Sequence, residues 1–234
     1  MKKKFIDPLI KRKANLTKNV QSKDRSKIEL IQNKALELSL FLSLPAMMAL
    51  LIAPNEITSA LFGYGEFDLN STNNSARALF YFALGLPAFS IIKIFSSFLF
   101  ARHNTKIPFY FSLISVAVNV ILSLYFFKDV GFIIIPIATT ASSWLNSLLL
   151  FIYLNNKKYF SINLNLINNL LKIFMSTIIT SIFFYNLIDY YSNRLLYENE
   201  YKLLVIMVLV IITFVAYIII SILTKAFKIS DIKL

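Results

Sequence analysis

The chain contains no cysteine and only one histidine, His103. Disulfides and thiolate metal sites are therefore excluded, and so are clusters of imidazole ligands. Because the sequence has only four glycines, it has no glycine-rich loop that could cradle a phosphate. Acidic residues are scarce as well, 12 against 24 lysines and arginines, and no two of them form an acid–base pair inside an apolar stretch. These absences argue against an enzyme and against a bound metal or cofactor.

What the chain has in abundance is apolar residues, 57% of 234, against 15% charged. The mean hydropathy is +0.66, and a soluble fold of this composition would leave far too much apolar surface exposed. A helix needs about 20 mostly apolar residues to cross a bilayer, and an apolar run without water to pair its backbone must be helical. Six stretches approach that length: Leu36–Pro54, Ala78–Phe100, Phe109–Phe127, Gly131–Leu154, Leu166–Leu187 and Leu203–Leu223. The sequence predicts an all-α fold, a polytopic membrane bundle of six transmembrane helices.

The basic residues predict the orientation of that bundle. If the N-terminus lies inside the cell, 19 of the 24 lysines and arginines fall on inside segments or on the inner ends of spans. The outside loops then hold only Arg77, Lys128, Arg194 and Lys202, and acids outnumber them there. Because basic loops stay cytoplasmic, both termini are predicted inside (N-in, C-in). The net charge of +12 is then explained by membrane anchoring, with no nucleic acid as partner.

The spans divide the chain into three predicted parts. Residues 1–25 form a basic cytoplasmic tail, which either contacts anionic lipid or is simply solvated. A helix is expected to begin near Ser26, because Ser26 and Glu29 fit a capping box ahead of an apolar run at helical spacing. Residues 26–154 then carry four spans, and residues 155–234 carry two more.

Two connections and one interruption complete the predicted organisation. Residues 55–77 are expected to form an outside loop with aromatic anchors at headgroup depth. Lys128–Asp129 are expected to form a very short outside hairpin. Gly85 and Pro87 interrupt the second span, which either kinks the helix beside a cavity or reflects ordinary helix packing.

Lys93 is the clear basic residue deep inside a predicted span. A lysine at the bilayer centre costs about 2.5–3.5 kcal/mol, so its presence needs an explanation. One hypothesis is that Lys93 faces a polar cavity and binds an anionic group such as a phosphate. The other is that its side chain snorkels to the inner surface, about 10 Å away at the end of the span near Phe100.

Asn119 and Asn146 are uncharged polar residues at mid-span. Residues of this kind most often form hydrogen bonds between membrane helices, so helix packing is the favoured interpretation of both. Contact with a polar substrate is the alternative. Trp144 lies beside Asn146, and its apolar body suits a helix interface.

Five runs of residues between positions 44 and 154 resemble motifs of one protein family, in the family's order and at its spacing. The runs are LPA at 44–46, LFGYGEF at 61–67, ALGLPA at 83–88, FARHNTKIP at 100–108 and SWLN at 143–146. They are similar to the family's Leu-Phe-x-x-Gly-x-Phe loop, its Tyr-Ala-Arg-x-Asp-Thr-x-Thr-Pro turn and its Ala-Trp-Leu-Asn run, among others. On these runs the chain resembles the lipid II flippase family (MurJ/MviN) of the multidrug/oligosaccharidyl-lipid/polysaccharide exporter superfamily.

The resemblance implies a fold and a mechanism. Family members have two six-helix lobes and two extra helices, and this chain looks like part of the second lobe plus the extra pair. Members flip undecaprenyl-linked peptidoglycan precursor across the bacterial inner membrane by alternating access, and a lysine at the position of Lys93 lines their central cavity. The chain departs from the family at Asn104, which stands where members have an acid. The segments that carry most of the pyrophosphate-binding arginines of members are not present.

The resulting hypothesis is the C-terminal part of a lipid II flippase that needs a separately encoded N-terminal half. Its partners would be membrane lipid and an undecaprenyl-pyrophosphate-linked substrate. Lys93 would contact that substrate, with Asn119 and Asn146 as further candidates. The alternatives are an inactive gene remnant or another non-transporting membrane protein, and an exporter of a different lipid-linked glycan.

Overall fold

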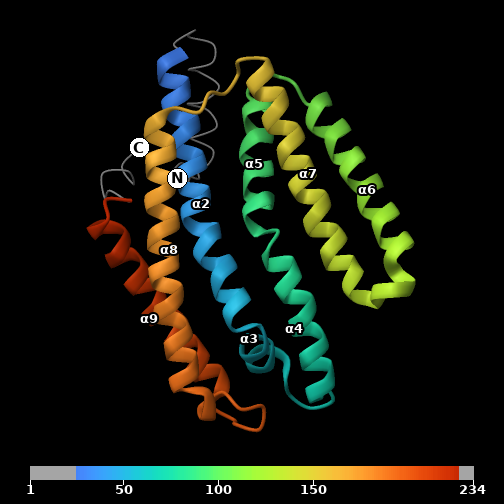
Figure 1. The fold of residues 1–234 in the computed structure, drawn as a ribbon, viewed down its shortest axis with the longest axis vertical. Coiled ribbons are helices and arrows are strands. Elements are labelled where there is room, and N and C mark those ends of the chain that lie inside the picture. Colours follow the sequence, from blue (N-terminus) through green and yellow to red (C-terminus); the bar gives the residue numbers. More distant parts are fainter. Residues whose placement is uncertain (1–24, 227–234) are drawn as a thin grey trace, which may run out of the picture.

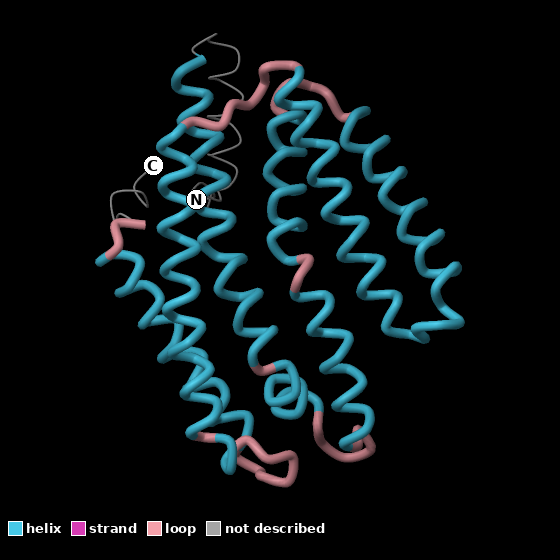
Figure 2. The backbone as a smooth tube through the Cα atoms, viewed as in Figure 1, coloured by secondary structure: helices cyan, strands magenta, loops and turns pink. Residues whose placement is uncertain are grey.

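The computed structural model describes residues 25–226, and every regular element in that part of the chain is a helix (Figures 1 and 2). The all-α prediction is therefore confirmed. The elements are α2 (Arg25–Ile52), α3 (Pro54–Phe62), α4 (Leu69–Ala83), α5 (Leu86–Phe100), α6 (Lys106–Val130), η1 (Gly131–Ile133), α7 (Ile134–Asn156), α8 (Leu164–Tyr190), η2 (Ser192–Arg194) and α9 (Lys202–Leu223).

Several of these helices are long and apolar enough to cross a bilayer, as a multi-pass membrane protein requires. By length and composition the described residues contain four such helical stretches, and the bent pair of α4 and α5 makes a fifth. One of the four, Lys106–Asn156, is 51 residues long. It reverses direction at η1, so that α6 and α7 lie against each other as an antiparallel pair (Figure 1).

The long helices form a row in which each packs on its neighbours. Across the molecule the order is α9, α8, α2, α5, α7 and α6, with α4 continuing the line of α5 and α3 lying across one end (Figure 1). The start of α2 and the connections α5–α6 and α7–α8 lie together at one end of the long helices, the top in Figure 1. Because the helices are arranged side by side, many large apolar side chains of the described residues stay exposed.

Arg25, the first residue that the structure describes, already belongs to α2, so the expected helix start near Ser26 stays a prediction. The predicted basic tail, apart from its last residue, lies outside the described residues. The predicted hairpin at Lys128–Asp129 was placed slightly early. Both residues belong to the last turn of α6, and the chain reverses at Gly131, whose φ of 71° lies in the left-handed region that glycine adopts without strain.

The predicted loop at residues 55–77 was largely wrong, because α3 and the first half of α4 occupy it. Pro54 opens α3 at a position where its missing N–H is no loss. The backbone N–H of Ser71 donates to Oδ1 of Asp68 at 2.7 Å, which caps α4 and lowers the pKa of the Asp68 carboxyl. The first turns of α4 are rich in asparagine and serine, so hydropathy alone places the start of this span at Ala78 instead of Leu69.

The interruption at Gly85 and Pro87, for which the sequence left a kink and ordinary packing open, coincides with a bend. The axes of α4 and α5 differ by 43°, and the break falls at residues 84–85. Proline cannot donate a backbone hydrogen bond to the preceding turn, which favours a bend at this point of the helix. Whether this break serves a gating movement stays a prediction.

Buried apolar side chains gather in three clusters along the row. At the end with the basic connections, the cluster is Leu36, Phe95, Phe98, Leu99, Leu150, Leu154, Phe160 and Leu166. At the opposite end, α8 and α9 pack on α2 and α3 through Ala53, Ala60, Phe184, Ile188, Leu195, Ile206 and Leu209. Between these clusters, the hydroxyl of Tyr217 on α9 donates to the carbonyl of Phe41 on α2 at 2.8 Å.

Candidate functional site

Lys93 lies on an exposed face of α5, and one polar side chain lies about one helical turn away from it in each direction. Ser90 precedes it by three residues and Ser97 follows by four, so all three share one side of the helix. The hydroxyl of Ser97 donates to the carbonyl of Lys93 at 2.8 Å. In the part of the chain that the structure describes, no hydrogen bond or ion pair engages the Lys93 ammonium. The charge is thus free to meet a group from outside these helices.

A recess of about 640 Å³ opens between the end of α5 and the beginning of α6. Its walls are Ser96, Phe100, Thr105, Lys106, Pro108, Phe109, Tyr110 and Ser112. Ser96 lies three residues beyond Lys93, so the recess begins within one turn of that lysine. Lys106, exposed at the start of α6, adds a second positive charge to the same region.

Asn146 connects this recess to α7. Its Nδ2 donates to the hydroxyl of Ser112 at 3.5 Å, and Ser112 lines the recess. Its Oδ1 is buried and has no hydrogen-bond partner. Neither Lys93 nor Asn146 lines the recess itself. Lys93 lies one helical turn from Ser96 in its wall, and Asn146 is bonded to Ser112 in its wall.

Asn119 is placed elsewhere, in the seam between α6 and α7. Its Nδ2 donates to the hydroxyl of Thr139 at 2.9 Å, and the hydroxyl of Ser115 donates to the carbonyl of Ser142 at 2.6 Å. Asn119 lies seven residues beyond Ser112, or about 10 Å along the helix. These contacts are those of a residue that holds two membrane helices together, and they keep Asn119 apart from the recess.

The break between α4 and α5 is held by side chains of α7, a role that sequence analysis missed for Trp144. The indole Nε1 of Trp144 donates to the carbonyl of Leu84 at 3.1 Å, and the hydroxyl of Thr140 donates to the carbonyl of Tyr81 at 2.7 Å. Backbone carbonyls released at a kink in a membrane helix need such donors. The position of Gly85 explains the close approach, since a Cβ there would lie 3.1 Å from Oγ1 of Thr140.

An apolar groove of about 200 Å³ runs between α2, α8 and α9. Pro45, Ala46 and Ala49 on α2 give it a wall of small side chains, and Phe184 and Phe214 give it aromatic walls. The threonines of α8 that line the groove do not make it polar, because their hydroxyls are bonded within the helix. The hydroxyls of Thr177 and Thr180 donate to backbone carbonyls of their own helix at 2.8 Å, and so present mostly methyl groups to the groove. A hydrocarbon chain suits such a lining.

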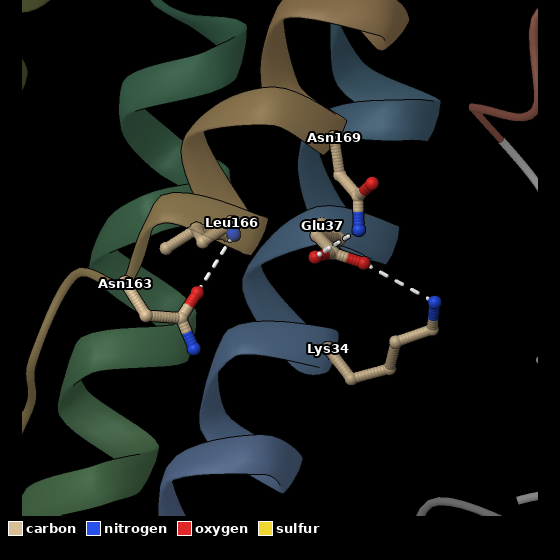
Figure 3. A network of polar contacts seen from close by, with 5 residues as sticks. All are labelled: Lys34, Glu37, Asn163, Leu166 and Asn169. Carbon is tan, nitrogen blue, oxygen red and sulfur yellow. Dashed lines mark hydrogen bonds and ion pairs between the residues drawn. The ribbon is translucent and has the colours of Figure 1, made fainter.

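A polar network joins α2 to α8 close to the basic end of the row (Figure 3). The carboxylate of Glu37, only 8% exposed, accepts from Nδ2 of Asn169 at 2.9 Å and pairs with Lys34 at 3.1 Å. Oδ1 of Asn163 accepts from the backbone N–H of Leu166 at 2.7 Å and caps α8. Sequence analysis had no signal for the bond between Glu37 and Asn169, because 132 residues separate them.

Lys202 forms a second contact that the sequence did not predict. The residue is 2% exposed, and its ammonium donates to the carbonyl of Gly63 at 2.7 Å and to that of Tyr197. It also lies 4.5 Å from the centre of the Tyr64 ring. The hydroxyl of Tyr197 in turn donates to the carbonyl of Phe67 at 2.6 Å. These bonds tie the connection between α8 and α9 to the one between α3 and α4.

Comparison with known proteins identifies one family. Residues 14–206 match the family model described as lipid II flippase MurJ. A probable lipid II flippase MurJ of Rhizobium meliloti (strain 1021) is 44% identical over 121 residues, covering 52% of this chain and 23% of the relative. One from Rickettsia prowazekii (strain Madrid E) is 35% identical over 138 residues, covering 59% and 27%. The chain thus spans about a quarter of the length of these curated relatives.

The three-dimensional fold gives the same result. A solved structure titled lipid II flippase MurJ, inward closed conformation, superimposes with a TM-score of 0.71 at 25% sequence identity. The superposition covers 91% of this chain and 42% of that one. The helices described above therefore correspond to less than half of the solved protein.

Proposed function

Because this chain belongs to the lipid II flippase family MurJ, we propose that it forms part of a flippase for undecaprenyl-pyrophosphate-linked peptidoglycan precursor in the bacterial inner membrane. The observation that carries the proposal is the family match over residues 14–206. The geometry supports it in two ways: the uncovered lysine on α5 is suited to an anionic group, and the apolar groove is suited to a hydrocarbon chain.

We propose that the row crosses the membrane six times, with both termini in the cytosol. The bent pair α4–α5 would make one crossing, and α2, α6, α7, α8 and α9 one each. In favour of this count, Lys106–Asn156 folds into two packed helices, each long enough for the hydrocarbon core. The basic connections α5–α6 and α7–α8 share one end of the row, as the positive-inside rule requires of cytosolic loops. Residues 26–154 would then form four spans of a lobe and residues 155–234 an added pair, preceded by the basic tail.

Lys93 is the residue proposed to contact the charged part of the cargo. An unpaired ammonium inside a span is costly unless a polar cavity or an anion accompanies it. Asn146, with its free Oδ1, is proposed as a second contact beside the recess. Asn119 is proposed to act indirectly, by fixing α6 against α7. The groove between α2, α8 and α9 is proposed to hold part of the isoprenoid chain.

Activity is proposed to require a companion polypeptide that supplies the remainder of the family fold. Transporters of this kind move one lobe against another around a site at mid-membrane. A single row of helices offers one wall of such a site. The exposed polar face of α5 is where we expect the companion and the cargo to meet this chain.

Complementation tests the proposal. Cells depleted of their own flippase would receive this chain alone, a companion covering the remaining helices alone, or both. We expect growth only with both, loss of rescue for Lys93→Ala, and full rescue for Lys128→Ala, which removes an exposed charge at the far end of α6. Failure of the wild-type pair, when both polypeptides accumulate in the membrane, would contradict the proposal and favour a non-transporting membrane protein.

A further inference from the structure

A second polar pocket, of about 640 Å³, lies at the end of the long helices where α2 begins. The first turns of α2, the turn after α5 and the connection α7–α8 surround it. The residues that matter for its chemistry are Glu29, Gln32, Arg102, Lys157 and Lys158. Arg102 lies nine residues beyond Lys93, or about 13 Å along the chain direction of α5, so this pocket is distinct from the face proposed for the cargo.

The pocket has an excess of positive charge that its own carboxylate does not neutralise. Arg102, Lys157 and Lys158 line it together with one acid, Glu29. Oε1 of Glu29 accepts from the hydroxyl of Ser161 at 2.8 Å, and among the described residues no ion pair joins Glu29 to any of the three basic groups. A pocket of this charge attracts anions.

The guanidinium of Arg102 is fixed in place yet retains free donors. Nη1 donates to the carbonyl of Phe98 at 2.8 Å, Nη2 donates to the carbonyl of Tyr159 at 3.1 Å, and the group lies 4.6 Å from the centre of the Tyr159 ring. Five N–H groups are available on a guanidinium, so these two bonds leave others for a ligand. Partial burial lowers the pKa of Arg102, and a bound anion would offset that effect.

Gln32 supplies the observation that points to a ligand. Its side chain is fully buried at 0% exposure, and both Nε2 and Oε1 lack a hydrogen-bond partner. Leaving a buried polar group unpaired costs about 1–3 kcal/mol, and native proteins rarely do so without a reason. Gln32 lines the same pocket as the basic groups, where its Nε2 can donate to a ligand oxygen.

We propose that this pocket binds a phosphate group through Arg102, Gln32 and the lysines at 157 and 158. Planar guanidinium groups form paired, charge-assisted hydrogen bonds with phosphate oxygens, and the amide of Gln32 completes the set with a neutral donor. The phosphate can belong to an anionic lipid headgroup at the membrane surface or to a soluble phosphate. This binding is separate from transport and does not depend on the identity of the cargo.

The test measures thermal unfolding of the purified chain in lipid nanodiscs. Three conditions are compared: phosphatidylcholine alone, phosphatidylcholine with added phosphatidylglycerol, and phosphatidylcholine with inorganic pyrophosphate in the buffer. If the unfolding midpoint rises with added phosphatidylglycerol but not with pyrophosphate, the ligand is a lipid headgroup. If it rises with pyrophosphate, a soluble phosphate binds. If neither raises the midpoint of the wild-type chain, the proposal is overturned.

Gln32→Leu distinguishes a built site from general attraction to basic surface. The variant keeps every charge and removes the unpartnered amide, so it should unfold at a higher temperature than wild type when no ligand is present. It should also need about tenfold more ligand for the half-maximal shift, the loss expected for one hydrogen bond to a charged group. Lys225→Gln removes an exposed charge just after α9, outside both the pocket and the recess, and it should leave the response unchanged. An unaltered response in Gln32→Leu would contradict the proposal.

Discussion

Trp144 connects two helices through one atom, because its indole Nε1 donates to the carbonyl of Leu84 at the break between α4 and α5. Trp144→Phe keeps the aromatic body and removes only that donor. We expect a loss of about 0.6–1 kcal/mol in the free energy of unfolding, measured by denaturant titration in detergent. Trp144→Tyr restores no donor in the same position and should lose a similar amount. A variant as stable as wild type would show that another donor satisfies this carbonyl.

Lys202 is the residue whose removal should destabilise the connections most. Its buried ammonium donates to two backbone carbonyls from different connections, and hydrogen bonds to charged groups contribute about 1.5–3 kcal/mol each. Lys202→Met should therefore lower the free energy of unfolding by about 3–6 kcal/mol and speed hydrogen exchange in α3.

Lys128→Met is the matched control for that measurement. Lys128 is exposed, and substitutions at such positions usually change stability by less than about 0.5 kcal/mol. If both variants lost the same stability, the contacts of Lys202 with Gly63 and Tyr197 would not explain its burial.

At the scale of single elements, hydropathy located the apolar centres of the helices well and their polar ends poorly. All six predicted stretches lie largely within helices, because a long apolar run admits no other structure in lipid. The beginning of α4 was missed because asparagine and serine fill its first turns, and the cap at Asp68 depends on a local hydrogen bond that composition does not register.

The candidate site shows the same limit. The sequence singled out Lys93 for its charge within a span, and its exposed position on α5 follows from helix periodicity once the neighbours are known. The partners of Asn119 and Asn146 come from a different helix, and so does the partner of Glu37. One sequence carries no signal for such pairs, since they depend on which helices become neighbours.

At the bend between α4 and α5, substitutions of Gly85 and Thr140 should have coupled effects on stability. A Cβ at Gly85 would lie 3.0 Å from Phe89 and 3.1 Å from Oγ1 of Thr140. Gly85→Ala should therefore push α5 and α7 apart and cost about 1–3 kcal/mol, as overpacking does. Thr140→Ala removes the obstructing hydroxyl, so the double variant should lose less than the sum of the two single losses. Strictly additive losses would contradict the contact between these positions.

At the scale of the whole molecule, the row of helices implies a defined orientation in the membrane. The absence of cysteine allows single cysteines to report it without background. Lys106→Cys and Lys157→Cys should react only with reagent on the cytosolic side, and Glu66→Cys and Glu198→Cys only with reagent on the opposite side. Labelling of the 157 and 198 positions from one side would contradict the six crossings.

The row also explains why the family fold needs more than these helices. The described helices expose many large apolar side chains, and the solved relative is more than twice as long as the part matched here. The side of α5 that carries Ser90, Lys93 and Ser97 is the part of this surface that we propose a companion covers.

The most direct test of the account is the amount of lipid-linked precursor that reaches the outer leaflet. It is measured in flippase-depleted cells with an external enzyme that cleaves only exposed precursor. With this chain and its companion together, we expect cleavage at the level of undepleted cells, and for Lys93→Ala beside the same companion at least about tenfold less, the effect of one lost charge-assisted contact. If the Lys93→Ala pair delivers as much precursor as the wild-type pair, Lys93 does not bind the cargo and the proposed site is wrong.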